Sequence, residues 1–176
     1  MVVVVEGNLL ESPAQVLTNT VNCVGAMGAG IALEFKNRFP AMHEDYQKRC
    51  AAKSVAIGRP YLWEDESHQI LNFPTKLHWK NPSELSYIEA GLKYLAEHHD
   101  EMGISSIAMP ALGCGLGGLN WNDVLPLVEK HLGPIATLDV FIYKPKSAAS
   151  KTSPSESEKS SSSTDSDSAA AQPPLF

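Results

Sequence analysis

The chain has 176 residues, a hydrophobic fraction of 43% and a formal net charge of −6 from 14 basic and 20 acidic residues. This length and composition fit one globular domain with a core of its own. The acidic balance argues against a protein that holds long nucleic acid by neutralising its phosphates, although a few basic groups suffice for local contact with a nucleic-acid end. The three cysteines form no CxxC pair, which indicates neither a zinc site nor a disulfide framework, so we expect a cytoplasmic protein.

The two ends of the chain differ from the segment between them. The run Val2–Val5 is too short for a signal-peptide core and lacks a basic lead-in, so we expect a buried first strand; no apolar run is long enough to span a bilayer. After Tyr143, residues 147–171 are almost all Ser, Ala, Thr, Asp, Glu and Lys. Such a segment buries too little apolar surface to offset its ordering entropy. We therefore predict one domain over residues 1–145 and a disordered Ser-rich tail over 146–176.

Strand and helix patterns alternate along the domain. Short apolar runs predict strands over residues 2–6, 16–20, 61–63, 70–73, 106–110 and 137–143. Helical spacing predicts helices over residues 31–38, 42–52 and 84–102, and a last helix that ends near residue 131. We expect Ser86 and Glu89 to form a capping box, Gly103 to stop that helix, and Asn120 or Asn122 to cap the last one. The alternation predicts a three-layer α/β/α fold with helices on both faces of a mixed, mostly parallel sheet.

Two glycine-rich segments, residues 25–31 and 113–118, each follow a predicted strand and precede a predicted helix. Glycine lets backbone N–H groups approach a ligand closely, and the start of the following helix adds a positive dipole end. One such loop would be weak support for a ligand site, but two in equivalent positions predict a diphosphate held between them. Neither segment has the ending of a Walker P-loop or the spacing of a dinucleotide-binding fingerprint.

Asn19, Asn22 and Cys23 lie between the second predicted strand and the first glycine-rich loop. An amide here can hydrogen-bond a sugar hydroxyl, orient a water or simply cap the turn. We assign the capping role to Asn19 and the functional role to Asn22. No basic residue adjoins Cys23 or Cys114, so we interpret both as packing residues and not as nucleophiles.

Residues 73–80 gather two lysines, a histidine and an aromatic ring between a strand and the long helix. A lysine here could stabilise charge or attack a sugar aldehyde, and His78 with Trp79 could stack on a base. A solvated basic loop anchored by a buried Trp79 fits the same residues equally well. His98 and His99 are expected on a polar surface, and no His/Asp/Glu grouping has metal-ligand spacing.

Four motifs, at residues 6–10, 19–32, 72–76 and 110–121, together resemble the macrodomain family. The resemblance spans residues 2–143 and implies the macrodomain fold. Within the family it is closest to the DarG-type branch of antitoxins, which remove ADP-ribose from DNA bases modified by a DarT-type toxin.

The resemblance assigns roles to single residues. Asn8 and Leu9 would meet the adenine, although the family usually has aspartate where Asn8 stands, and Lys76 matches the catalytic lysine of the branch. Asn22 would orient the distal ribose and take part in catalysis. The remaining substrate-binding residues would surround the distal ribose and the diphosphate: Gly25, Met27, Gly28, Ala29, Gly30, Ile31, Thr75, Gly113, Cys114, Gly115, Leu116, Gly117 and Gly118.

Two departures from relatives refine this expectation. Gly117 stands where protein-deacylating relatives carry an aspartate, which favours the DarG-type branch. DarG proteins carry a further C-terminal domain that blocks the toxin, whereas a Ser-rich tail follows the domain here, so we expect no direct toxin neutralisation. Hydrolytic reversal does not need that domain.

The sequence thus predicts a metal-independent ADP-ribosyl glycohydrolase that acts on thymidine-linked ADP-ribose in DNA, with ADP-ribose as its ligand and product and without a cofactor. The expected protein is a monomer that makes no membrane contact and opposes a DarT-type toxin functionally. Two alternatives remain open. One is a non-catalytic reader of ADP-ribose, and the other is a hydrolase of a small ADP-ribose derivative or of protein-linked ADP-ribose.

Overall fold

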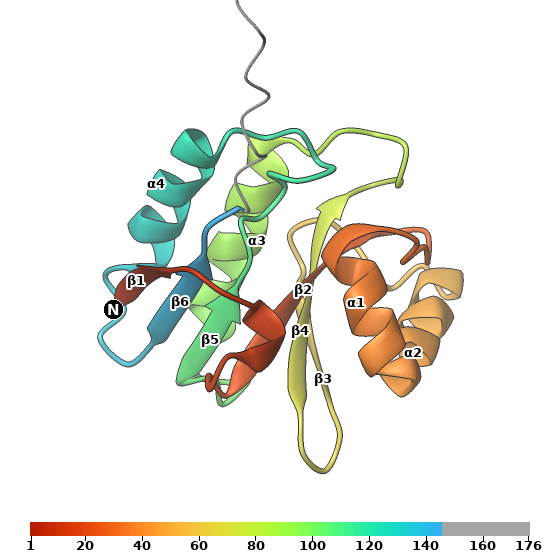
Figure 1. The fold of residues 1–176 in the computed structure, drawn as a ribbon, viewed down its shortest axis with the longest axis horizontal. Coiled ribbons are helices and arrows are strands. Elements are labelled where there is room, and N and C mark those ends of the chain that lie inside the picture. The colour runs from red at the N-terminus through yellow and green to blue at the C-terminus, as the bar shows by residue number, and fades with distance from the viewer. Residues whose placement is uncertain (146–176) are drawn as a thin grey trace, which may run out of the picture. The chain divides into compact units, whose positions relative to one another are not determined.

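The computed structural model describes residues 1–145; the predicted Ser-rich tail lies outside the described residues. Its centre is a six-stranded sheet in the order β1-β6-β5-β2-β4-β3 (Figure 1). The strands are β1 (Val2–Val5), β2 (Val16–Asn22), β3 (Tyr61–Glu64), β4 (Gln69–Lys76), β5 (Ser106–Met109) and β6 (Asp139–Tyr143). All neighbouring pairs are parallel except β3 with β4. The predicted mixed, mostly parallel sheet is confirmed.

Helices cover both faces of this sheet, which gives the expected three layers (Figure 1). The helices are α1 (Gly30–Arg38), α2 (Pro40–Ala51), α3 (Leu85–His98) and α4 (Trp121–Leu132), with a short 3-10 helix η1 (Leu9–Glu11) before β2. α1 and α2 pack on one face in a core around Phe35, Met42 and Tyr46. α3 and α4 pack on the other face. None of these helices is long and apolar enough to cross a membrane.

The close packing of α3 on the sheet follows from its residues. Ile88, Leu92 and Leu95 recur at helical spacing and are fully buried, each contributing about 1.5–3 kcal/mol by burial. Gly91 stands on the same face because a Cβ atom there would collide with the ring of Phe73 on β4. The helix can therefore lie directly against the strand that leads to residues 73–80.

The capping box predicted for α3 is wrong. Glu84 is the N-cap residue without a side-chain cap, and the Ser86 hydroxyl donates to the Glu84 carboxylate at 3.4 Å. Glu89 instead accepts hydrogen bonds from Lys130 and His131 of α4, at 2.7 and 2.9 Å. The helix also ends at His98, five residues before Gly103, and so is shorter than predicted.

Three other expectations about elements are resolved by the structure. β1 is half-buried and not buried, because it is an edge strand that pairs with β6 alone within the described residues. β4 runs three residues beyond its predicted end, as far as Lys76. Asn120 and not Asn122 caps α4, accepting from the Asn122 N–H at 2.9 Å.

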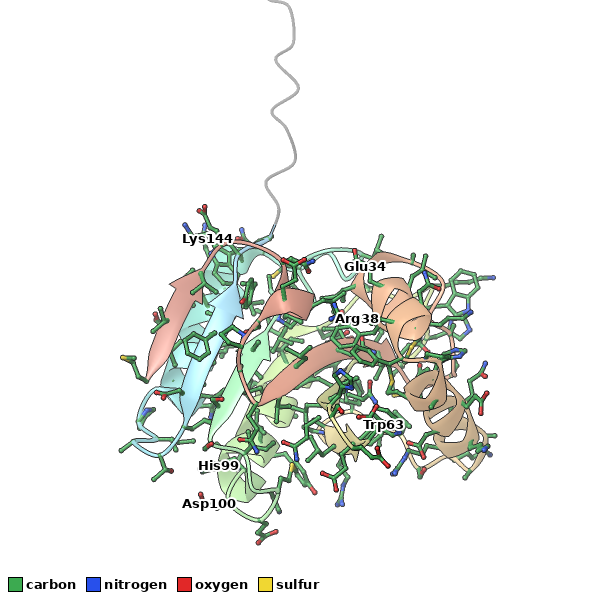
Figure 2. The ribbon with its side chains drawn as sticks, turned by 60° about the horizontal axis from the view of Figure 1, so that its bottom comes forward. Glu34, Arg38, Trp63, His99, Asp100 and Lys144 are labelled. Atoms are coloured by element: carbon green, nitrogen blue, oxygen red, sulfur yellow. The ribbon has the colours of Figure 1, made fainter. Side chains whose placement is uncertain are left out.

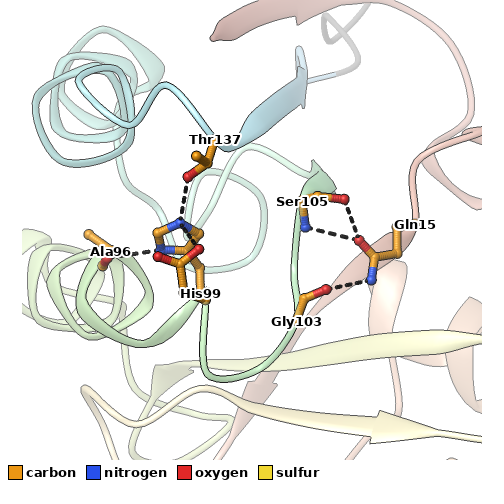
Figure 3. A network of polar contacts seen from close by, with 7 residues as sticks. Gln15, Ala96, His99, Gly103, Ser105 and Thr137 are labelled. Atoms are coloured by element: carbon orange, nitrogen blue, oxygen red, sulfur yellow. Dashed lines mark hydrogen bonds and ion pairs between the residues drawn. The ribbon is translucent and has the colours of Figure 1, made fainter.

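A polar network fixes the amino ends of the strands (Figure 3). The Gln15 side chain donates to the Gly103 carbonyl at 2.7 Å and accepts from the N–H and hydroxyl of Ser105. His99 is buried there, with its ring nitrogens 3.0 Å from the Ala96 carbonyl and 3.3 Å from the Thr137 hydroxyl. The expectation that His99 lies on a polar surface is wrong. This edge of the sheet is tied together and lies opposite the loops described next.

Candidate functional site

A cleft of about 910 Å³ opens at the carboxyl ends of the strands. β5, β2 and β4 are neighbours in the sheet, and the two glycine-rich loops and residues 73–80 extend from their carboxyl ends. Because parallel strands end at one edge, three segments distant in sequence meet there. Figure 2 shows Glu34 and Lys144, which also line the cleft, at the edge opposite His99 and Asp100.

Most of the predicted substrate-binding residues line this cleft. They are Asn8, Leu9, Asn22, Gly28, Ala29, Gly30, Ile31, Thr75, Lys76, Gly113, Cys114, Gly115, Leu116 and Gly117. Three predicted residues do not line it. Gly25 lines a neighbouring depression of about 450 Å³ with Cys50, and Met27 is buried beneath the first loop. Gly118 closes the turn of the second loop, its N–H 3.2 Å from the Gly115 carbonyl oxygen.

Two of the cleft glycines have no structural reason to be glycine. A Cβ atom on Gly28 or Gly115 would meet nothing within 4 Å, and neither residue has a positive φ. By contrast, Gly113 has φ +72°, and a Cβ on Gly117 would collide with the Gly113 carbonyl. Glycine at Gly28 and Gly115 leaves the backbone uncovered at the cleft, where a ligand could approach it closely.

The side chain of Asn22 organises the first glycine-rich loop. Its oxygen accepts from the N–H groups of Val24 at 3.0 Å and Ala26 at 3.3 Å, and its amide nitrogen donates to the Ala26 carbonyl at 2.7 Å. The Tyr46 hydroxyl of α2 adds a bond of 2.8 Å to the same oxygen. The turn-capping role assigned to Asn19 therefore belongs to Asn22, which keeps one amide N–H for a ligand.

Asn19 is fully buried and does not cap the turn. Its amide nitrogen lies 3.1 Å from the side-chain oxygen of Asn72, its direct partner on β4, and 3.9 Å from the sulfur of Met27. This polar pair joins β2 to β4 under the first loop. It supports the loop from below without reaching the cleft.

Asn8 has a structural role as well as its place in the cleft. Its side-chain oxygen accepts from the Leu10 N–H at 3.1 Å and so caps η1. Because the Leu10 N–H is a donor, the oxygen of the Asn8 carboxamide must face it. The amide N–H donors of Asn8 therefore remain available. An aspartate could make the same cap but would offer no donor.

Lys76 joins two of the three segments. The ladder between β2 and β4 skips Thr75, next to Pro74 with its missing N–H, so that Asn22 lies opposite Lys76. The Lys76 amine donates to the Leu116 carbonyl at 2.9 Å and reaches the Trp79 carbonyl at 3.5 Å. The amine is therefore held at the cleft between β4 and the second loop.

Trp79 is 53% exposed and lines the cleft. The interpretation of residues 73–80 as a loop anchored by a buried tryptophan is therefore wrong. The ring lies beside His78 and Lys80 in the same turn.

The cysteines near the site are protonated thiols at neutral pH. Burial raises the pKa of Cys114 to about 11 and also raises the pKa of Cys23 and of Cys50. Cys114 lines the cleft but carries no thiolate character at physiological pH. Cys114 and Cys23 each pack against one of the two core clusters, which agrees with the prediction that they are packing residues.

Sequence reasoning missed several residues of the site. Thr20, Glu34, Pro110, Ala111, Tyr143 and Lys144 also line the cleft. Tyr143 and Lys144 could have been found, because the last strand of a parallel sheet ends at the same edge as β2 and β5. The hydroxyl of Tyr46, on α2, hydrogen-bonds the side chain of Asn22 at the end of β2, and no local sequence pattern indicates that contact.

Comparisons with known proteins agree with this geometry. The Macro domain family model matches residues 18–128. The DNA ADP-ribosyl glycohydrolase of Thermus aquaticus is 43% identical over 145 residues, which is 80% of this chain and 40% of that protein. The solved macrodomain of Mycobacterium tuberculosis DarG is 43% identical with a TM-score of 0.80, covering 83% of this chain and 99% of that one. Thermosipho africanus DarTG, solved in complex with ADP-ribose, is 42% identical with a TM-score of 0.78, covering 82% and 41%. The chain spans about two fifths of the length of the DNA ADP-ribosyl glycohydrolases it matches.

Proposed function

Because this chain belongs to the macrodomain family, we propose that it is an ADP-ribosyl glycohydrolase that removes ADP-ribose from thymidine-type bases in DNA. The observation that carries the proposal is the Lys76 amine, held at a cleft between two glycine-rich loops. The relatives named DNA ADP-ribosyl glycohydrolases support the choice of reaction. The Thermosipho africanus neighbour, solved with ADP-ribose, supports the choice of ligand.

In this proposal the cleft holds ADP-ribose along its length. The adenine lies at Asn8 and Leu9, and the diphosphate lies against the N–H groups of Gly28 and Gly115 near the first turn of α1. That helix start adds a positive dipole end, so the diphosphate needs no lysine for its binding. The distal ribose then reaches Asn22 and Lys76, which stand opposite each other on β2 and β4.

Lys76 acts on the bond between the distal ribose and the base. Hydrolysis breaks the bond from the anomeric carbon to the base, a water oxygen takes the place of the base, and the base leaves with a proton. A lysine ammonium has three N–H donors, of which two point to the carbonyls of Trp79 and Leu116. The third faces the leaving base and stabilises the negative charge that develops there.

We propose that the reaction needs neither a metal ion nor a cofactor. Among residues 1–145, no group of three or more His, Cys, Asp and Glu side chains is placed to hold a metal ion. Turnover in excess EDTA tests this point. Turnover at the rate measured without chelator is expected, and a loss that added Mg²⁺ or Zn²⁺ restores would contradict it.

A substrate panel tests the activity. Purified protein is incubated with thymidine-ADP-ribosylated single-stranded DNA, ADP-ribosylated protein, ADP-ribose 1''-phosphate and O-acetyl-ADP-ribose, and free ADP-ribose is measured. We expect release from the DNA first and fastest. Release only from a small derivative or from protein would move the function to that alternative, and binding of ADP-ribose without any release would make the chain a reader.

The biological setting follows from the same proposal. The chain would oppose a DarT-type toxin by reversing its modification, as a monomer in the cytoplasm. A Thermosipho africanus relative that is 42% identical is a fusion of a DNA ADP-ribosyl transferase and a glycohydrolase, which supports this pairing of activities. Co-expression with a DarT-type toxin is expected to remove the modification from DNA.

A further inference from the structure

The side chain of Trp79 lies at the rim of the cleft with more than half of its surface open to solvent. Its exposed fraction is 53%, and its main-chain carbonyl is 3.5 Å from the Lys76 amine. An apolar ring that is mostly exposed contributes little hydrophobic stabilisation to the fold. Trp79 is not among the hydrophobic residues that pack against either core cluster. The ring therefore calls for a function at the cleft.

The ring belongs to a fixed aromatic and cationic group, which we call the Trp79 platform and define as His78, Trp79 and Lys80. The His78 and Trp79 rings are stacked with centroids 5.4 Å apart, and the Lys80 amine lies 5.0 Å from the Trp79 centroid. The Lys80 N–H donates to the His78 ring at 3.2 Å, and the Leu77 carbonyl accepts from the Cys23 N–H at 3.3 Å. These bonds set the turn before any ligand arrives.

The segment of the chain that carries the Trp79 platform is basic, whereas the chain as a whole is acidic. No acidic residue stands between Glu66 and Glu84, whereas Lys76 and Lys80 both fall in that interval. The net charge of the chain is −6. A stretch that is locally basic and carries an exposed aromatic ring fits single-stranded nucleic acid, whose bases stack and whose phosphates are negative.

We propose that the Trp79 platform stacks on the nucleobase next to the modified nucleotide and so selects single-stranded DNA over an isolated modified nucleoside. This inference rests on the proposed function and adds the length and form of the substrate. The base attached to ADP-ribose lies at Lys76, the neighbouring base lies on the Trp79 ring, and the phosphate between them lies near Lys80. A duplex cannot reach the ring in this way, because its neighbouring bases remain stacked on each other.

Two measurements on the full chain test this inference. The first is binding of unmodified fluorescein-labelled oligothymidine, compared among wild type, Trp79→Ala, Trp79→Phe and Leu77→Ala. Leu77 is the matched control, because its exposed fraction of 49% is similar and it stands in the same turn without an aromatic ring. Loss of one stacked base weakens binding by about tenfold or more in Trp79→Ala, and Trp79→Phe recovers most of it. Lys80→Ala lowers the salt slope by about 0.7.

The second measurement is the KM for hydrolysis of two substrates, an ADP-ribosylated oligonucleotide and ADP-ribosyl-thymidine alone. Trp79→Ala is expected to raise the KM for the oligonucleotide about tenfold more than the KM for the nucleoside. An equal loss on both substrates would overturn the inference, because the ring would then serve the modified nucleotide itself. Equal binding of oligothymidine by wild type and Trp79→Ala would also overturn it. Oligothymidine binding that depends on Trp79 without any hydrolysis would refute the proposed function alone.

Discussion

The Tyr46 hydroxyl lies 2.7 Å from the main-chain oxygen and 2.8 Å from the side-chain oxygen of Asn22. Tyr46 is fully buried on α2, and Asn22 ends β2 where the first glycine-rich loop begins. Burial raises the pKa of the Tyr46 phenol, so it remains a hydrogen-bond donor throughout the physiological range. The helix layer therefore holds the loop through one side chain that never touches the cleft.

Tyr46→Phe is expected to loosen this loop. The change removes one hydroxyl and leaves the Asn22 oxygens with one donor fewer, which costs about 1 kcal/mol in the free energy of unfolding. ADP-ribose affinity measured by calorimetry falls by about fivefold, because the loop is less well ordered before binding. Tyr94→Phe is the control, since that ring stacks on His98 outside the cleft. Equal affinity of the two variants would contradict the coupling.

Gly28→Ala separates binding from stability. The new Cβ meets nothing within 4 Å and φ is not positive, so the change introduces no strain into the folded state. Because alanine reduces the conformational freedom of the unfolded chain, the free energy of unfolding should rise by up to about 1 kcal/mol. ADP-ribose affinity is expected to fall by roughly tenfold, because the methyl group occupies the approach to the backbone. Unchanged affinity in calorimetry would place the diphosphate elsewhere.

Gly117→Ala, in the second loop, is expected to lower the stability of the protein. Its Cβ would collide with the Gly113 carbonyl and the Ser83 hydroxyl, so the backbone must shift at a cost of about 1–3 kcal/mol. Thermal unfolding measures this loss, and Gly115→Ala is the matched control because its Cβ meets nothing within 4 Å. A Gly117→Ala protein as stable as Gly115→Ala would show that the loop adapts freely.

Cys114 is expected to react slowly with iodoacetamide at neutral pH. Burial raises its pKa to about 11, and only the thiolate reacts, so the alkylation rate should climb steadily from pH 7 towards pH 11. Saturating ADP-ribose should slow the reaction further, because Cys114 lines the cleft. Peptide mapping by mass spectrometry follows this site alone. Alkylation at pH 7 as fast as that of free glutathione would contradict the assignment.

Local sequence predicts the two glycine-rich loops but not the contacts of Glu89. The sequence predicts both loops because glycine runs between a strand and a helix have a local cause, and neighbouring parallel strands then bring the loops together. Glu89 looked like part of a capping box, yet its partners Lys130 and His131 stand 41 and 42 residues away. That contact depends on how α3 and α4 pack, which no local pattern contains.

Local sequence does not determine the exposure of Trp79 for a similar reason. A tryptophan between a strand and a helix can anchor a loop or stand at a ligand site, and the residues around it are the same in both cases. Only the tertiary packing of the turn against β2 and the second loop decides between them. Asn22 takes the capping role and Asn19 stays buried beneath the loop, because their partners, the Tyr46 hydroxyl and the buried Asn72, come from distant segments.

The pair of Glu89 with Lys130 and His131 predicts a pH dependence of stability. Hydrogen bonds from Lys130 and then His131 lower the pKa of Glu89 from its ordinary 4.5 to about 2. A carboxyl with a lowered pKa in the folded state stabilises above its ordinary pKa, and the gain is lost as the pH falls from about 4.5 through about 2. The melting temperature of wild type should therefore exceed that of Glu89→Gln at pH 7, and the difference should close over that interval. A difference that stays constant down to pH 2 would contradict this.

The proposed glycohydrolase activity depends most on Lys76. Wild type, Lys76→Ala and Lys93→Ala, whose exposed lysine lies on α3, are incubated with thymidine-ADP-ribosylated single-stranded DNA, and ADP-ribose binding is measured on the same samples. The account predicts that Lys76→Ala releases ADP-ribose at least about a hundredfold more slowly while binding ADP-ribose within a few-fold of wild type, and that Lys93→Ala behaves like wild type. Full release by Lys76→Ala would contradict the central claim.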